Sequence, residues 1–104
     1  MTTRREYFGL KFEWDEIKAK TNWQKHGIRF ETAAKAFKDE NRMTQLDEKH
    51  SQEEERYITL AKAHDVLFVV HTQRGEEYIR LISARVAEPD EEAIYYGNRT
   101  LFPV

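Results

Sequence analysis

The sequence predicts an α+β fold, because helical and strand periodicities occupy separate parts of the chain. Apolar residues recur at helical spacing up to about residue 37, and they alternate with a period of two between residues 42 and 86. Two helices followed by a run of strands favour an antiparallel sheet over a parallel α/β sheet. The 104 residues suffice for a single domain, 1–104, and leave no room for a second core.

The predicted N-terminal layer consists of two helices. Residues 1–11 are polar and are expected to be flexible. Asp15 suits the N-cap of a helix that runs to about His26, because its carboxylate can accept hydrogen bonds from the free amides of the first turn. Gly27 suits the left-handed residue that ends this helix. A second helix carries an apolar stripe at i, i+3, i+4 and i+7, formed by Phe30, Ala33, Ala34 and Phe37.

A four-stranded antiparallel meander and a short helix complete the prediction. The strand at 66–70 is apolar on both sides, so it should lie in the centre of the sheet. Pro89 opens a helix that ends near Tyr96, and 98–104 is expected to be a C-terminal tail. Because the helices must bury their apolar stripes, they should cover one face of the sheet and leave the other free for a ligand. The remaining strands are expected at residues 42–46, 56–63 and 78–86.

Composition and missing motifs exclude several classes of function. The absence of cysteine excludes a disulfide scaffold, a Cys-ligated zinc site and thiol catalysis. The absence of a glycine-rich phosphate loop, an HExxH motif and a GxSxG motif gives nucleotide cofactors, zinc peptidase chemistry and serine hydrolysis no support. No apolar run approaches the ~20 residues of a membrane helix, and no secretion signal is visible. We therefore expect a cytoplasmic protein with no cofactor and no membrane partner.

The net charge of −2 conceals an alternation along the chain. Residues 1–30 and 56–87 are net basic, whereas residues 31–55 and 88–104 are net acidic. A locally basic surface can attract phosphate even when the whole molecule is slightly acidic. The alternative is an ordinary surface of mixed charge.

The last predicted strand carries three polar side chains among apolar ones: Arg80, Ser83 and Arg85. Strict alternation places Ser83 and Arg85 on one face and Arg80 on the other, and a bulge near Ser83 would bring all three together. A guanidinium group offers a fixed fork that matches the oxygens of a phosphate. The alternative is that both arginines pair with nearby carboxylates.

The charged loop from residue 47 to 56 is a second candidate site. His50 and Glu54 are groups that can act as base and acid, and Arg56 follows them. Asp47 and Glu53 with His50 suggest a hard-metal site, although their spacing matches no specific metal motif. A solvated charged loop with no chemical role is the other alternative.

Two further groups of polar residues are weaker candidates. Lys25 and His26 lie at the end of the first predicted helix, where Lys25 can contact phosphate. His26 can instead cap the helix carbonyls or pack on Trp23. His71, late in the central strand, alternates with Leu67 and Val69, which favours a partly buried ring with a structural role.

Motifs spread over about residues 12–96 resemble those of the BrnT toxin family. They are Phe12-Glu13-Trp14-Asp15, Lys18, Asn22, Lys25-His26-Gly27-Ile28, Phe30, Ala33-Ala34, Phe37, His50-Ser51, Glu54, Arg56, Val69-Val70, Thr72, Arg74 and Arg80-Leu81-Ile82-Ser83-Ala84-Arg85. The resemblance implies a RelE-like fold and the ribonuclease toxin of a bacterial type II toxin–antitoxin pair. It also implies a complex with a BrnA-like ribbon-helix-helix antitoxin, through which alone the toxin would reach operator DNA.

The hypothesis that follows is metal-independent cleavage of RNA, in which the 2′-hydroxyl attacks the adjacent phosphate. Arg80 and Arg85 would stabilise phosphate charge with support from Arg56, and His50 or Glu54 would be the base or acid. Lys25, His26 and Ser83 would contact the RNA, and no metal ion or cofactor would take part. The alternative is a non-catalytic module that binds the antitoxin and acts in operon autoregulation. The acidic C-terminal helix and the low net charge favour this alternative.

Overall fold

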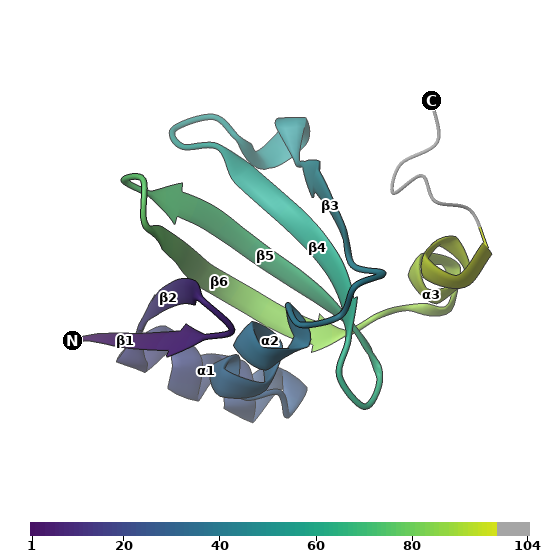
Figure 1. The fold of residues 1–104 in the computed structure, drawn as a ribbon, viewed down its shortest axis with the longest axis horizontal. Helices are drawn as coiled ribbons and strands as arrows, with labels where there is room; N and C mark the ends of the chain where they lie inside the picture. Colours follow the sequence, from purple (N-terminus) through teal and green to yellow (C-terminus); the bar gives the residue numbers. More distant parts are fainter. Residues whose placement is uncertain (98–104) are drawn as a thin grey trace.

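Three α-helices flank a six-stranded sheet in the computed structural model, which describes residues 1–97 (Figure 1). The predicted tail, 98–104, lies outside the described residues. The strand order is β1-β2-β6-β5-β4-β3, and every neighbouring pair is antiparallel except β2 and β6, which are parallel. The strands are β1 Thr2–Tyr7, β2 Leu10–Asp15, β3 Met43–Leu46, β4 Arg56–Lys62, β5 Val66–Arg74 and β6 Tyr78–Val86.

The predicted α+β class and the antiparallel run from β3 to β6 are confirmed, but the predicted four-stranded antiparallel sheet is wrong. The segment expected to be flexible, 1–11, instead holds β1 and the start of β2. Phe8 and Gly9 have φ of 56° and 78°, the left-handed pair that a tight hairpin turn needs. The parallel register of Phe12 opposite Ile79 then joins this hairpin to the last strand and makes the sheet mixed.

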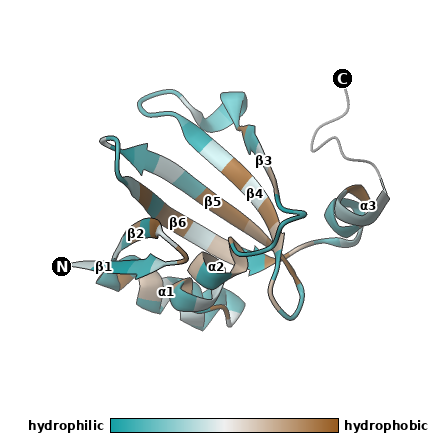
Figure 2. Cartoon of the chain, viewed as in Figure 1, coloured by the Kyte–Doolittle hydropathy of each residue, from teal (hydrophilic) through white to brown (hydrophobic). Residues whose placement is uncertain are grey.

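Helices α1 (Glu16–His26) and α2 (Phe30–Ala36) cover one face of the sheet, as predicted. The Asp15 carboxylate accepts a hydrogen bond from the Lys18 amide at 3.1 Å, and Gly27 ends α1 with a φ of 68°. Buried side chains of α2, its C-cap Phe37 and the sheet form the main core, and Ala19 of α1 packs against it. The core includes Phe12, Trp14, Phe30, Leu67, Val69, Leu81 and Ala84. Figure 2 shows that hydrophobic residues concentrate in the middle of β4, β5 and β6.

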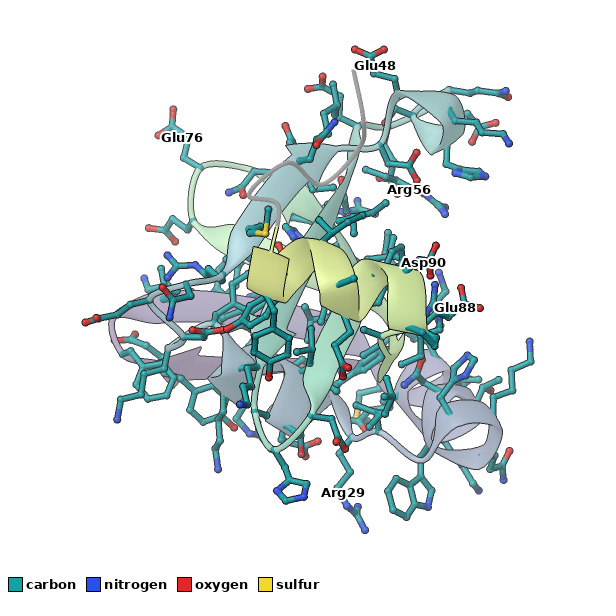
Figure 3. The ribbon with its side chains drawn as sticks, turned by 90° about the vertical axis from the view of Figure 1, so that its right-hand side faces the viewer. Arg29, Glu48, Arg56, Glu76, Glu88 and Asp90 are labelled. Atoms are coloured by element: carbon teal, nitrogen blue, oxygen red, sulfur yellow. The ribbon has the colours of Figure 1, made fainter. Side chains whose placement is uncertain are left out.

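The opposite face of the sheet is called the second face below. The prediction that this face is left free is wrong, because a helix covers part of it. Helix α3 (Pro89–Gly97) packs on it and buries Tyr95 with Ile58, Leu60 and Val66 in a second apolar cluster. Figure 3 views the molecule from the side on which α3 lies in front of the strands. The helix covers only part of the second face, so the remaining part is available to a ligand.

His71 is buried in the core, where a structural role was predicted. Its ring stacks on Tyr57 and meets the edge of Phe37, and its Nε2 lies 2.7 Å from the Thr59 hydroxyl. Burial lowers the pKa of the imidazole from 6.5 to about 4, because the low-dielectric surroundings disfavour the charged form.

This lowered pKa predicts a loss of stability in mild acid. The unfolded chain takes up a proton on His71 near pH 6.5, whereas the folded chain does so only near pH 4. The contribution is complete above pH 6.5 and is lost as the pH falls toward 4, with a magnitude on the order of 3 kcal/mol. Urea unfolding at pH 7 and pH 4.5 should show a smaller decrease for His71→Gln than for the wild type. Equal decreases would contradict the assignment to His71.

Candidate active site

A bulge in β6 brings the three polar side chains of this strand to the second face. Val70 pairs with Ser83 but His71 pairs with Leu81, so one residue of β6 is extra. The bulge therefore allows both Leu81 and Ala84 to face the core, where they are buried. Consequently Arg80, Ser83 and Arg85 share the opposite face. The separation of Arg80 by strict alternation is wrong, and the bulged arrangement is confirmed.

Asn22 fastens helix α1 to the strand beside this bulge. Its amide nitrogen donates to the carbonyl oxygens of Ala84 and Ile28 at 2.8 and 3.0 Å, and its amide oxygen accepts from the Ala84 N–H at 3.0 Å. Asn22 is buried although it follows the same helical stripe as Trp23, whose side chain is exposed. The helix thus fixes the backbone that carries Ser83 and Arg85.

A cavity of about 830 Å³ opens on the second face beside α3. It brings together three predicted site residues, His50, Arg56 and Ser83. Its lining combines apolar side chains of the sheet with polar side chains, among them Glu91 of α3. Figure 3 shows Arg56 on the same side of the molecule as Glu88, which precedes α3, and Asp90 in the first turn of α3. The remaining lining comes from Gln45, Leu46, Asp47, Glu48, Lys49, Ile58, Phe68, Val70 and Ile82.

His50 lies on the rim with a carboxylate partner. It belongs to the short 3₁₀ helix Glu48–His50, and its Nδ1 lies 2.8 Å from an Asp47 carboxylate oxygen. In the neutral ring this contact places the proton on Nδ1, because the carboxylate can only accept, and it leaves Nε2 able to take up a proton. The side chain is 61% exposed and is therefore accessible to a substrate.

Ser51 connects the loop that carries His50 to the start of β4 through hydrogen bonds. The Ser51 hydroxyl donates to the Asp47 carbonyl oxygen and accepts from the Arg56 N–H at 2.9 Å, while the Asp47 N–H donates to the Arg56 carbonyl at 2.7 Å. These bonds hold His50 and Arg56 on the same rim. Within residues 1–97, no carboxylate pairs with the Arg56 guanidinium, so its charge is available to a ligand.

Arg80 is held away from the cavity by a carboxylate. Its Nη1 donates to Glu13 at 2.6 Å, and Glu13 is itself only 5% exposed in strand β2. The parallel register places these two residues side by side, and Arg4 of β1 also contacts Glu13. The alternative of internal pairing therefore describes Arg80. Sequence reasoning missed Glu13, because only the unforeseen pairing of β2 with β6 brings it near.

Arg85 is also paired and does not line the cavity itself, but its contacts Glu91 and Phe68 do. Its two terminal nitrogens donate to the two Glu91 carboxylate oxygens at 2.8 and 2.9 Å, and its guanidinium lies 4.1 Å from the centre of the Phe68 ring. Glu88 adds a longer contact at 3.6 Å. The hydrogen bonds to Glu91 raise the pKa of Arg85 above its usual value. The acidic first turn of α3 was visible in the sequence, but its approach to Arg85 was not.

The other predicted residues are less closely associated with the cavity. Glu54 contacts Arg74 at 3.4 Å and lines a neighbouring hollow of about 690 Å³, whose lining also includes His50 and Arg56. Lys25 and His26 lie in the last turn of α1, which packs on the other face of the sheet, and they line neither hollow.

The three residues considered as an alternative hard-metal site do not converge. In the described part of the chain, no group of three His, Asp or Glu side chains is placed to hold a metal ion, and this includes Asp47, His50 and Glu53.

A membrane-spanning helix is not found among residues 1–97, because each helix there is too short or too polar for this.

Comparison with known proteins identifies the family. Residues 14–91 match the model of a family described as the ribonuclease toxin, BrnT, of type II toxin–antitoxin systems. The chain belongs to the BrnT family. The matched range includes every candidate site residue, whereas strand β1, most of β2 and most of α3 lie outside it.

One solved structure supports the same assignment. The crystal structure of the Brucella abortus ribonuclease toxin, BrnT, is similar to this chain with a TM-score of 0.55 and 25% sequence identity. The match covers 72% of this chain and 92% of the Brucella chain. No curated protein gives a significant sequence match. The BrnT family and its mixed α+β fold are therefore supported by both sequence and structure.

Proposed function

We propose that this BrnT family member is an endoribonuclease that cleaves RNA by metal-independent attack of a 2′-hydroxyl on the adjacent phosphate. The products would be a 2′,3′-cyclic phosphate and a 5′-hydroxyl end. This chemistry needs a base near the 2′-oxygen, a cation at the developing negative charge, and an acid for the leaving oxygen. The observation that supports the proposal is that the His50–Asp47 pair lines one open cavity together with Arg56, which has no carboxylate partner among residues 1–97.

Each group of the cavity has a role in this scheme. His50 exchanges the proton through Nε2 while Asp47 keeps the ring oriented. Arg56 binds the phosphate and stabilises its transition-state charge, and Ser83 contacts the RNA on the cavity floor. Glu54 is the second candidate for proton transfer because its hollow shares His50 and Arg56.

The remaining predicted residues have secondary roles in this scheme. Arg85 adds a second phosphate contact when it is not paired with Glu91. Lys25 and His26 would be accessory contacts for RNA that extends past the cavity. We assign Arg80 to the support of the sheet through Glu13, in place of the direct phosphate contact expected from sequence.

Cleavage in the presence of EDTA tests this proposal. We expect the wild type to cut RNA in EDTA and His50→Ala to be slower by about 10²–10⁴-fold, because the proton acceptor is lost. His64→Ala, in the β4–β5 turn, is the matched control and should cut like the wild type. End-group analysis should find the cyclic phosphate. A requirement for added metal, or equal rates for His50→Ala and wild type, would reject the scheme.

The biological setting is proposed by extension from the family. The toxin would act in the cytoplasm, inhibit growth, and be neutralised in a hetero-oligomer with a BrnA-like ribbon-helix-helix antitoxin that carries the operator DNA contacts. Induction of the chain alone should arrest growth, and expression of the adjacent small reading frame should restore it.

A second candidate function is a non-catalytic module that binds the antitoxin and contributes to autoregulation. The specific observation that favours it is that Arg80 and Arg85, two of the three arginines expected at the site, are both in internal ion pairs. This candidate predicts formation of the antitoxin complex without RNA cleavage and without growth arrest when the chain is expressed alone.

A further inference from the structure

The first turn of α3 presents a carboxylate to the second face at the edge of the cavity. Both oxygens of Glu91 accept hydrogen bonds from Arg85, at 2.8 and 2.9 Å, and Glu91 also lines the cavity that contains His50 and Arg56. The guanidinium is positioned by the face of Phe68 at 4.1 Å. Arg85 thus has a fixed orientation, and its two donors point to a pair of oxygen atoms.

A carboxylate and a phosphate offer the same arrangement to such a fork, because each presents two oxygens to parallel N–H donors. We propose that Glu91 is a built-in competitor for an RNA phosphate at Arg85, and that α3 is the cover that delivers it. This inference rests on the proposed function, since the displaced ligand is the RNA of that same cavity. RNA would bind fully only after the first turn of α3 releases Arg85.

The attachment of α3 is consistent with such a cover. The later part of the helix is held by Tyr95 in the second apolar cluster and by its hydrogen bond to Asp39. The first turn, by contrast, is rich in acidic residues and meets the sheet through the Glu91–Arg85 pair. When only a fraction of the molecules has a free Arg85, the apparent dissociation constant for RNA equals the intrinsic constant divided by that fraction, so RNA binds more weakly.

Glu91 makes a second contact, and a variant used to test the proposal should keep it. One of its oxygens accepts the Glu88 N–H at 2.8 Å, the reciprocal part of a helix N-terminal capping arrangement. Glutamine also serves at this position of a capping box. Glu91→Gln therefore keeps the helix start while it removes the charge that competes with phosphate.

The test measures affinity for an RNA oligonucleotide that carries 2′-fluoro groups and cannot be cleaved, by fluorescence anisotropy at fixed salt. We expect Glu91→Gln to bind roughly fivefold to tenfold tighter than the wild type, because an opposing bidentate ion pair is removed. Glu92→Gln makes the same charge change on an exposed neighbour and should shift affinity less than about twofold. The gain should vanish when Arg85→Ala is combined with Glu91→Gln.

A second variant distinguishes the loss of the contact between residue 91 and Arg85 from the loss of the negative charge at residue 91. Glu91→Asp keeps the negative charge but is one methylene too short for the bidentate contact, so it should also bind RNA more tightly than the wild type. It provides the test if Glu91→Gln fails to fold, which thermal unfolding would show. Equal gains for Glu91→Gln and Glu92→Gln, or a gain that persists without Arg85, would overturn the inference.

Failure of the inference and failure of the proposed function have different signatures. A wild type that binds the oligonucleotide but does not cut ordinary RNA contradicts the nuclease proposal alone. A wild type that cuts RNA while Glu91→Gln binds no tighter contradicts the inference alone. If none of the variants binds RNA, both are rejected.

Discussion

Arg56→Ala is expected to lower the rate of RNA cleavage by about 10²–10³-fold, with little effect on the free energy of unfolding. Arg56 lines the cavity beside His50 and has no carboxylate partner within residues 1–97. Its removal therefore takes away a charge for the phosphate without leaving a buried carboxylate unpaired. Cleavage rates at saturating RNA and urea unfolding are the two measurements.

Arg5→Ala is the matched control for this experiment. Arg5 is exposed in β1, at the other edge of the sheet from β3 and far along the strand order from β4. The same change in net charge should leave its cleavage rate within about twofold of the wild type. A similar loss in both variants would show that overall charge controls the rate, and an unchanged Arg56→Ala would remove this residue from the mechanism.

Asn22→Ala is expected to lower the free energy of unfolding by about 3 kcal/mol or more. The change removes three hydrogen bonds and leaves the N–H and the carbonyl oxygen of buried Ala84 without this partner. The carbonyl of Ile28 loses a donor as well. Because Ala84 follows the bulge in β6, the variant should also lose precision at Ser83 and Arg85, and its cleavage rate should fall even where it is folded.

The control for Asn22 lies two residues further along the same helix. Gln24→Ala replaces an exposed amide, and it should change the free energy of unfolding by less than about 0.5 kcal/mol. Urea titrations of both variants give the comparison. A destabilisation of Asn22→Ala that is no larger than that of Gln24→Ala would show that the three hydrogen bonds contribute little.

The parts of the fold with local signals were predicted from the sequence. Asp15 and Gly27 mark the ends of α1, and both act as expected because capping depends on a few neighbouring residues. Strands β4 and β6 follow from their period of two, and the first part of β5 follows from a run that is apolar on both faces. The bulge near Ser83 was one of two arrangements that the sequence allowed, and only the structure decides between them.

The N-terminal hairpin was missed for a physical reason. Strand β1 is an edge strand of polar residues with neither face fully buried, so no period of two is present to reveal it. Strand β1 is held by backbone hydrogen bonds to β2, and such bonds do not depend on a recognisable pattern of side chains. The position of α3 was missed as well, because its short apolar stripe does not show which face of the sheet will receive it.

The sequence predicted several residues of the candidate site, but it did not predict which carboxylates pair with its arginines. His50, Arg56 and Ser83 do meet, because the loop before β4 folds over the second face. The partners that decide the state of each group come from distant segments or from another element: Glu13 for Arg80 and Glu91 for Arg85. Ion pairs of this kind depend on tertiary distance, which a list of residue types does not contain.

Because β2 pairs in parallel with β6, the sheet can be completed only after β6 has been synthesised. Residues 11–13 lie beside residues 78–80, so the inner edge of the N-terminal hairpin has no partner until the last strand has left the ribosome. Ser83 and Arg85 belong to that same late segment. A nascent chain therefore lacks both the complete sheet and the complete cavity until β6 has been synthesised and has left the ribosome.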